Sequence, residues 1–179
     1  MSLVGFKAQN HPQQTVRDAV DDRGTDPTFF ALMDQRFGPF TVDAAASTLN
    51  AKCERFWTIE DNGLVQPWAG ENVWCNPPYS DLRRWTFKAW SELSALVVML
   101  LPANRTEQGW WQGLIEPYRD RGLGLSVEFL PGRMRFVKPG SEAIGPNERP
   151  PFGCCLVIWT PRESMPEDLP SLGGQQDLF

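Results

Sequence analysis

Two adjacent prolines, Pro77 and Pro78, are the feature that most constrains how this chain can fold. Each proline fixes its own φ and removes a backbone N–H donor, so neither suits the middle of a sheet. A short apolar run, Asn72 to Cys75, lies directly before them, and a helical pattern begins after Ser80. We therefore expect the tetrapeptide Asn76-Pro77-Pro78-Tyr79 at the carboxyl end of a strand, immediately ahead of a helix.

The tetrapeptide carries groups that suit the planar amino group of an aromatic base. The Asn76 side-chain oxygen and the Pro77 carbonyl can each accept a hydrogen bond from that amino group. Two such bonds favour a pyramidal nitrogen whose lone pair points at an electrophile, while Tyr79 can stack on the ring for about 1–3 kcal/mol. Methyl transfer to this nitrogen needs alignment and placed acceptors, and no metal. An ordinary turn is the alternative interpretation, because Asn-Pro and Pro-Pro are common turn signals.

Strand-like and helix-like segments alternate along the chain. Strands are expected at 40–43, 55–59, 64–68, 72–75, 95–101, 123–130 and 154–159. Helices are expected between a cap at Thr25 or Asp26 and an exit at Gly38, over about 44–54, and after the caps Ser80 and Asn104. This alternation predicts an α/β fold with a mostly parallel central sheet and helices on both faces. The last two strands have no helix between them, so we expect an antiparallel hairpin at the sheet edge.

The length of 179 residues fits one domain. We expect a loose N-terminal arm over 1–24, the domain over 25–160, and a flexible tail over 161–179 that is rich in Pro, Gly and acids. No apolar run approaches the roughly 20 residues of a membrane span, and the N-terminus lacks the layout of a signal peptide. A single histidine and four cysteines without metal-ligand spacing argue against a metal site and favour a cytoplasmic location.

The net charge of −5 counts against a simple electrostatic nucleic-acid binder. Basic residues nevertheless cluster in two places. One pair follows the tetrapeptide and one group lies within the Gly/Pro-rich segment 132–151: Arg83 and Arg84, then Arg133, Arg135, Lys138 and Arg149. Ordinary solvated charges remain the alternative for each cluster.

A methyl donor needs its own pocket at the carboxyl ends of neighbouring strands. Asp43 ends the first strand, and the alanines after it leave room for a ligand to approach the backbone. Glu60 lies 17 residues further along, close to the offset of roughly 20 at which an acid binds ribose hydroxyls. The glycines of the dinucleotide fingerprint are missing, so both acids could equally be plain strand-end residues.

At this point the chain resembles a known family, the phage-type, Dam-like DNA N-6 adenine methyltransferases that use S-adenosylmethionine. The matching segments are Thr25-Asp26-Pro27, Phe37-Gly38-Pro39-Phe40, Val42-Asp43-Ala44-Ala45, Asn50-Ala51-Lys52-Cys53, Asn62-Gly63-Leu64, Trp68-Ala69-Gly70 and Val73 to Ser80. Looser matches follow at Leu101-Pro102-Ala103 with Arg105-Thr106, at Gly132 to Phe136 and at Pro151-Phe152-Gly153.

The resemblance implies a Rossmann-like class I methyltransferase fold, of a bacterial or bacteriophage protein, with catalysis at Asn76, Pro77, Pro78 and Tyr79. It implies S-adenosylmethionine as cofactor and S-adenosylhomocysteine as product. The implied cofactor contacts are Thr25, Pro27, Asp43, Ala44, Ala45, Glu60, Asp61 and Asn76. It also implies DNA as partner, which adds Arg105 to the six basic residues above as a DNA contact. A duplex base would have to be flipped out to reach the tetrapeptide.

Two departures from the family pattern bear on function. The family usually has Pro directly after Thr, whereas Asp26 intervenes here, which affects the expected contact with the cofactor carboxylate. No separate target-recognition domain is visible, so specificity would come from loops such as 132–151. Alternatives are the same chemistry on RNA or on a protein glutamine, or a degenerate, non-catalytic nucleic-acid-binding module.

The last five residues, 175–179, resemble the short motif by which bacterial replication proteins bind the sliding clamp. Gln175, Leu178 and Phe179 would make the contact. Tethering of this kind raises the local concentration on DNA and would offset the acidic net charge. The alternative is a solvated tail that ends in two apolar residues by accident.

Overall fold

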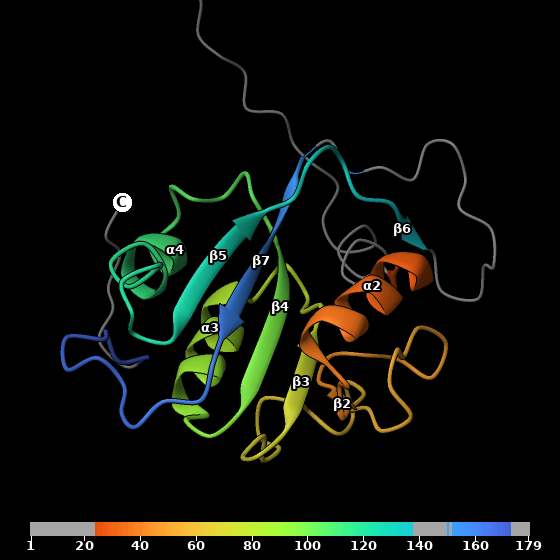
Figure 1. Ribbon diagram of the computed structural model, residues 1–179, viewed down its shortest axis with the longest axis horizontal. Coiled ribbons are helices and arrows are strands. Elements are labelled where there is room, and N and C mark those ends of the chain that lie inside the picture. The colour runs from red at the N-terminus through yellow and green to blue at the C-terminus, as the bar shows by residue number, and fades with distance from the viewer. Residues whose placement is uncertain (1–23, 138–149, 151, 173–179) are drawn as a thin grey trace, which may run out of the picture.

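A central sheet of five strands organises the molecule. The computed structural model describes residues 24–137, 150 and 152–172. The strands are β2 (Val42–Asp43), β3 (Asn72–Cys75), β4 (Leu96–Pro102), β5 (Leu125–Phe129) and β7 (Cys154–Trp159), in the order β2-β3-β4-β7-β5 (Figure 1). β2, β3 and β4 are parallel, and β7 runs antiparallel to both its neighbours. The mixed α/β fold with an antiparallel pair at one edge is thus confirmed.

Helices cover both faces of this sheet. The helices are α2 (Pro27–Phe37), α3 (Leu82–Ser91) and α4 (Gly109–Leu114). The side chains of each strand alternate between two apolar clusters, as a pleated sheet requires. In β3, Trp74 packs in the cluster of α2, whereas Val73 and Cys75 pack in the cluster of α3 and α4.

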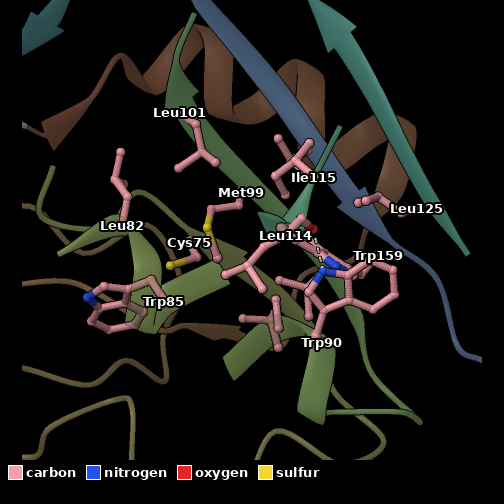
Figure 2. Close-up of a cluster of buried hydrophobic side chains, with 14 of the residues drawn as sticks. Cys75, Leu82, Trp85, Trp90, Met99, Leu101, Leu114, Ile115, Leu125 and Trp159 are labelled. Carbon is pink, nitrogen blue, oxygen red and sulfur yellow. Dashed lines mark hydrogen bonds between the residues drawn. The ribbon is translucent and has the colours of Figure 1, made fainter. Parts of the chain in front are cut away.

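The cluster under α3 and α4 is the larger of the two (Figure 2). Trp85 and Trp90 of α3, Leu114 of α4 and Met99 of β4 meet in it, and each is 6% exposed or less. The indole nitrogen of Trp90 donates a hydrogen bond of 2.6 Å to the Leu114 carbonyl, so a buried polar group is paired inside this cluster.

Local signals account for α2. The Asp26 carboxylate accepts hydrogen bonds from the backbone of Thr28 at 2.7 Å and Phe29 at 3.2 Å, and Pro27 occupies the first helical position. At the other end, the Gly38 N–H donates to the Asp34 carbonyl. Both predicted ends of this helix are therefore confirmed.

The predicted helix over 44–54 is wrong, because side chains rather than a helical ladder satisfy the backbone there. The Asp43 carboxylate accepts from the N–H groups of Ala45 and Lys52, and the Asn50 side chain accepts from Ser47 at 2.7 Å. Short polar side chains compete with helix formation in this way.

Two further expectations in the loop before β3 are corrected. The predicted strand at 64–68 is a turn, stabilised by a 3.0 Å hydrogen bond from the buried Trp68 indole to the Gly63 carbonyl. The predicted strand at 55–59 is reduced to one parallel bridge between Phe56 and Asp43. The caps also shift, since Asp81 rather than Ser80 precedes α3 and Gln108 rather than Asn104 precedes α4.

A second, two-stranded sheet was not predicted. β1 (Gly24–Thr25) pairs antiparallel with β6 (Phe136–Val137), with Thr25 opposite Phe136. Phe136 packs in the α2 cluster together with Met33 and Met134. This pairing joins a segment before α2 to the segment after β5, and it places Thr25 beside the central sheet.

Part of the predicted tail contacts α3. The Arg162 guanidinium donates to the carbonyls of Ala89 and Trp90 at the end of α3, and lies 4.9 Å from the Trp90 ring centre. Burial lowers the pKa of Arg162 to about 10. Among the helices that the structure describes, none has both the length and the apolar character needed to cross a membrane.

Candidate active site

The carboxyl ends of the parallel strands bring the predicted site residues to one edge of the sheet. β2 ends at Asp43, and the tetrapeptide follows β3 directly. Asp43 lies opposite Trp74 in the register of β2 and β3, and its N–H and carbonyl both bond to the backbone of the 55–57 segment. Since β4 points the same way, Arg105 leaves the sheet at this edge too.

A cleft opens at this edge, which we call the Asp43 cleft. It encloses about 250 Å³, open solvent included. Its lining residues come from β1, the ends of β2 and β3, and the 45–52 loop: Gly24, Thr25, Asp43, Ala45, Asn50, Lys52, Trp74 and Asn76. Four of the residues predicted to bind the cofactor or the target amine therefore line one cleft: Thr25, Asp43, Ala45 and Asn76.

The Asp43 carboxylate is the main charged group of the cleft. Only 3% of Asp43 is exposed, and burial raises the pKa of its carboxyl to about 6. Hydrogen bonds from the backbone N–H groups of Lys52 (3.0 Å) and Ala45 (3.4 Å), and the charge of Lys52, act in the opposite direction. Burial also lowers the pKa of Lys52, against the charges of Asp43 and Asp26.

Two buried polar groups of the cleft have no hydrogen-bond partner within the described part of the chain. They are the Thr25 hydroxyl and the Trp74 indole N–H. The Trp74 ring is fully buried, 5.4 Å from the Phe30 ring and 5.6 Å from the Phe40 ring between centres. Buried polar groups of native proteins are usually paired, so an unpaired donor on each of two residues that line the cleft is unusual.

The backbone of the tetrapeptide is held at two of its carbonyls. The Pro78 carbonyl accepts from the Asp81 N–H at 3.2 Å, and the Tyr79 carbonyl accepts from the Arg105 guanidinium at 2.8 Å. Within the described residues, none of the hydrogen bonds is accepted by the Pro77 carbonyl. Pro77 thus keeps the acceptor that the sequence assigned to a target amino group.

The Tyr79 side chain is packed in place. Its ring lies 6.1 Å from the Phe152 ring between centres, at an angle of 55°. Burial raises the pKa of the Tyr79 hydroxyl well above its ordinary value, and the neighbouring Cys154 thiol adds to the effect. This hydroxyl stays protonated at neutral pH.

Other residues predicted to bind the cofactor lie outside the lining of the cleft. Pro27 is exposed at the start of α2, and Ala44 is buried with its N–H bonded to the Trp74 carbonyl. Glu60 and Asp61 are exposed, and the Asp61 carboxylate accepts from Thr58. Their turn still adjoins the end of β2, because a Cβ on Gly63 would lie 2.1 Å from the Ala44 carbonyl oxygen.

The predicted DNA-binding residues are spread over several segments. Arg83 donates to the Ser171 carbonyl at 3.2 Å, and Arg84 pairs with Asp81 at 3.1 Å. Arg105 points to the tetrapeptide. Arg133 and Arg135 are exposed just before β6. Lys138 and Arg149 lie outside the described residues.

Sequence reasoning missed four lining residues. Gly24 was placed in the loose N-terminal arm. Asn50 and Lys52 stood within a segment that matched the family pattern, but that segment was predicted to be helical and was given no role. Trp74 looked like an ordinary strand residue of the core. Nothing in its spacing revealed an unpartnered indole N–H at the cleft. In the ranges 24–137 and 152–172, no group of three or more His, Cys, Asp or Glu side chains could hold a metal ion.

Comparisons with known proteins agree with the resemblance seen in the sequence. The chain is 38% identical over 127 residues to the DNA N-6-adenine-methyltransferase of Haemophilus phage HP1 (strain HP1c1), over 69% of this chain and 68% of that protein. It is 36% identical over 105 residues to the DNA N-6-adenine-methyltransferase of Escherichia phage T1, over 56% of this chain and 42% of that protein. The match thus covers less than half of the phage T1 relative.

A shorter relative comes from a bacterium. The protein named putative methyltransferase YfdM of Escherichia coli (strain K12) is 31% identical over 77 residues, which is 40% of this chain and 85% of that protein. The sequence model of the family described as DNA N-6-adenine-methyltransferase (Dam) matches residues 13–175. Since this match spans most of the chain, including the Asp43 cleft and the tetrapeptide, the chain belongs to the DNA N-6-adenine-methyltransferase (Dam) family.

Proposed function

We propose that this protein transfers a methyl group from S-adenosylmethionine to the exocyclic amino group of adenine in DNA. One observation carries the proposal. The tetrapeptide of Asn76 to Tyr79 follows β3 directly at the mouth of the Asp43 cleft, and the Pro77 carbonyl accepts no hydrogen bond within the described residues. Membership of the Dam family supports the same reaction.

The Asp43 cleft suits the amino-acid end of the cofactor. When bound, S-adenosylmethionine supplies an activated methyl sulfonium. The Asp43 carboxylate would pair with a cationic ammonium, and Lys52 would attract a carboxylate. The Thr25 hydroxyl and the Trp74 N–H would donate to the same ligand. The helix-covered sheet, with its ligand site at the carboxyl ends of parallel strands, fits the proposed Rossmann-like class I arrangement.

The role of the tetrapeptide follows from its acceptors. The Asn76 side-chain oxygen and the Pro77 carbonyl would each accept one N–H of the adenine amino group and orient its lone pair toward the cleft. They would also stabilise the positive charge that develops on the nitrogen. The Tyr79 ring would stack on the base, which is flipped out of the duplex.

DNA contacts would come from exposed basic residues near this edge. Arg84, Arg133 and Arg135 are exposed, and Arg83 is half-buried at the start of α3. Lys138 and Arg149 stay predicted contacts that fall outside the described residues. A sliding-clamp contact through Gln175, Leu178 and Phe179 also stays a prediction, because these residues lie outside the described part of the chain. A binding measurement between a peptide of 175–179 and a bacterial clamp would test it.

Transfer of a labelled methyl group tests the proposal. Purified protein and labelled S-adenosylmethionine are incubated with unmethylated DNA, with RNA and with a protein extract, and the labelled product is identified as N6-methyladenine. We expect label in DNA alone, and a loss of about 10²–10³-fold in kcat for Asn76→Ala. Arg36→Ala, an exposed residue of α2 paired with Glu128, is the matched control and should keep full activity.

Two results would contradict the proposal. Label in RNA or in glutamine side chains, with none in DNA, would move the same chemistry to the other substrate. Binding of DNA without any methyl transfer, unchanged by Asn76→Ala, would indicate a non-catalytic binding module.

A further inference from the structure

Arg105 makes a contact that its predicted role as a DNA contact does not explain. Its guanidinium Nη1 donates a 2.8 Å hydrogen bond to the Tyr79 carbonyl, 26 residues earlier in the chain. Arg105 is half-buried rather than exposed. A guanidinium engaged with a backbone carbonyl at the end of the tetrapeptide holds that peptide in one orientation.

The turn that carries Arg105 is itself held in place. The Arg105 carbonyl accepts from the Gln108 N–H at 3.2 Å, and the Thr106 carbonyl accepts from the Gln112 side chain at 2.7 Å. The chain just before this turn is also held, because the Ala103 N–H donates to the Gly153 carbonyl at 2.9 Å. The guanidinium is thus presented from a rigid connection between β4 and α4.

Residues of two segments contact Tyr79, the turn at Arg105 and the stretch from Phe152 to Cys154. Arg105 bonds to its carbonyl, the Phe152 ring packs on its ring, and the Cys154 thiol lies beside its hydroxyl. We call these three residues the Tyr79 clamp. The proline rings fix φ at 77 and 78, and the Asp81 N–H holds the Pro78 carbonyl. The contact from Arg105 adds a second held carbonyl at the end of the tetrapeptide, next to that of Pro78.

We infer that Arg105 is a positioning residue for methyl transfer: it holds the Tyr79 carbonyl, so that the Pro77 carbonyl and the Tyr79 ring keep the geometry that receives the target amine. This inference rests on the proposed function and deepens it. It assigns to Arg105 an effect on the chemical step, whereas a phosphate contact would act on DNA affinity. A displacement of about 1 Å at a reacting group can slow a reaction by about 100-fold.

The test separates kcat from KM. We expect Arg105→Ala to lower kcat by about 10–100-fold, with KM for DNA changed by less than about threefold and the salt dependence of DNA binding unchanged. Arg105→Lys, which keeps a donor, should recover part of kcat. Arg84→Ala is the contrasting variant: it should weaken DNA binding and lower the salt slope by about one. Arg36→Ala, at an exposed residue of α2, is the control that should keep both kcat and KM.

Cofactor affinity is measured as well, and melting temperature shows whether each variant folds. Titration of S-adenosylmethionine, followed by tryptophan fluorescence, should give the same Kd for Arg105→Ala as for the unmodified chain. If Arg105→Ala does not fold, the kcat of Arg105→Met decides, because Met keeps a long side chain and has no donor for the Tyr79 carbonyl. A kcat equal to that of the unmodified chain then overturns the inference. A raised KM with a reduced salt slope and unchanged kcat overturns it as well. Absence of any methyl transfer by the unmodified chain would instead remove the proposed function, and this inference with it.

Discussion

The Asp43 cleft and the Tyr79 clamp lie at the same edge of the sheet and are built in opposite ways. In the cleft, the Thr25 hydroxyl and the Trp74 N–H are buried without a partner in the described residues, and a buried carboxylate has a pKa raised to about 6. In the clamp, the Tyr79 carbonyl and ring are both engaged, by Arg105 and by Phe152.

On the proposed function, this difference separates a region that would receive the cofactor from one that would present a fixed surface to the target base. Unpaired buried donors cost free energy in the free protein and recover it when a ligand pairs with them. The half-buried Tyr79 ring is instead held against Phe152 and presents a fixed surface. Asn76 lies between the two regions, since it lines the cleft and begins the tetrapeptide.

The largest effect is expected at Asp43, because the folded protein binds its proton more tightly than the unfolded chain does. The carboxyl pKa rises from 3.8 to about 6 on folding. The contribution of Asp43 to stability therefore falls as the pH rises from 3.8 to about 6, and stays low above that, by up to about 3 kcal/mol. The free energy of unfolding of Asp43→Asn, measured with urea, should therefore rise relative to that of the unmodified chain by this amount as the pH increases from 4 to 7.

The affinity for the cofactor should decrease in Asp43→Asn, whereas the stability increases. An ammonium group on the ligand pairs with the ionised carboxylate, so cofactor affinity of the unmodified chain should fall as the pH drops below about 6. Asp43→Asn should bind more weakly at pH 7 and lose this pH dependence. A stability difference between the two proteins that is constant with pH would break the comparison on the cleft side.

The next largest effect is expected at the Tyr79 ring, the proposed stacking surface for the base. Tyr79→Ala removes the stacking surface, worth about 1–3 kcal/mol per base, so methyl transfer should fall by about 5–150-fold. Cofactor affinity should stay the same, since Tyr79 does not line the cleft. Tyr79→Phe keeps the ring beside Phe152 and is the matched control, with activity close to that of the unmodified chain. A cofactor Kd that changes with Tyr79→Ala would show that the two regions are coupled.

The sequence predicted the parts of this edge that depend on local signals. The caps of α2, the apolar face of α3 and the strand before Asn76 all follow from residues close in the chain. The tetrapeptide was recognised for the same reason, because its chemistry and its spacing lie within four residues.

The remainder depends on contacts between residues far apart in sequence. β1 and β6 are two residues long and pair across more than 100 positions, so neither has a local signature. The 44–54 loop looked helical from its alanines, but its N–H groups bond to the side chains of Asp43 and Asn50 instead. Arg105 was grouped with the DNA contacts because its charge was visible and its bond to Tyr79 was not.

The smallest effect is expected at Thr25, and it tests the comparison between cleft and clamp most directly. Thr25→Val replaces a buried, unpaired hydroxyl by a methyl group of similar size, so the free protein should be equally stable or more stable by about 1 kcal/mol. Cofactor affinity should nevertheless fall by about 2–10-fold, since a hydrogen bond to the ligand is worth about 0.5–1.5 kcal/mol. Thermal melting and cofactor titration measure the two effects, and Thr25→Ser, which keeps the hydroxyl, should retain most of the affinity. A loss of stability without a loss of affinity would mean that the Thr25 hydroxyl serves the fold, and the contrast between the cleft and the clamp would then rest on the buried Asp43 carboxylate and the Trp74 N–H.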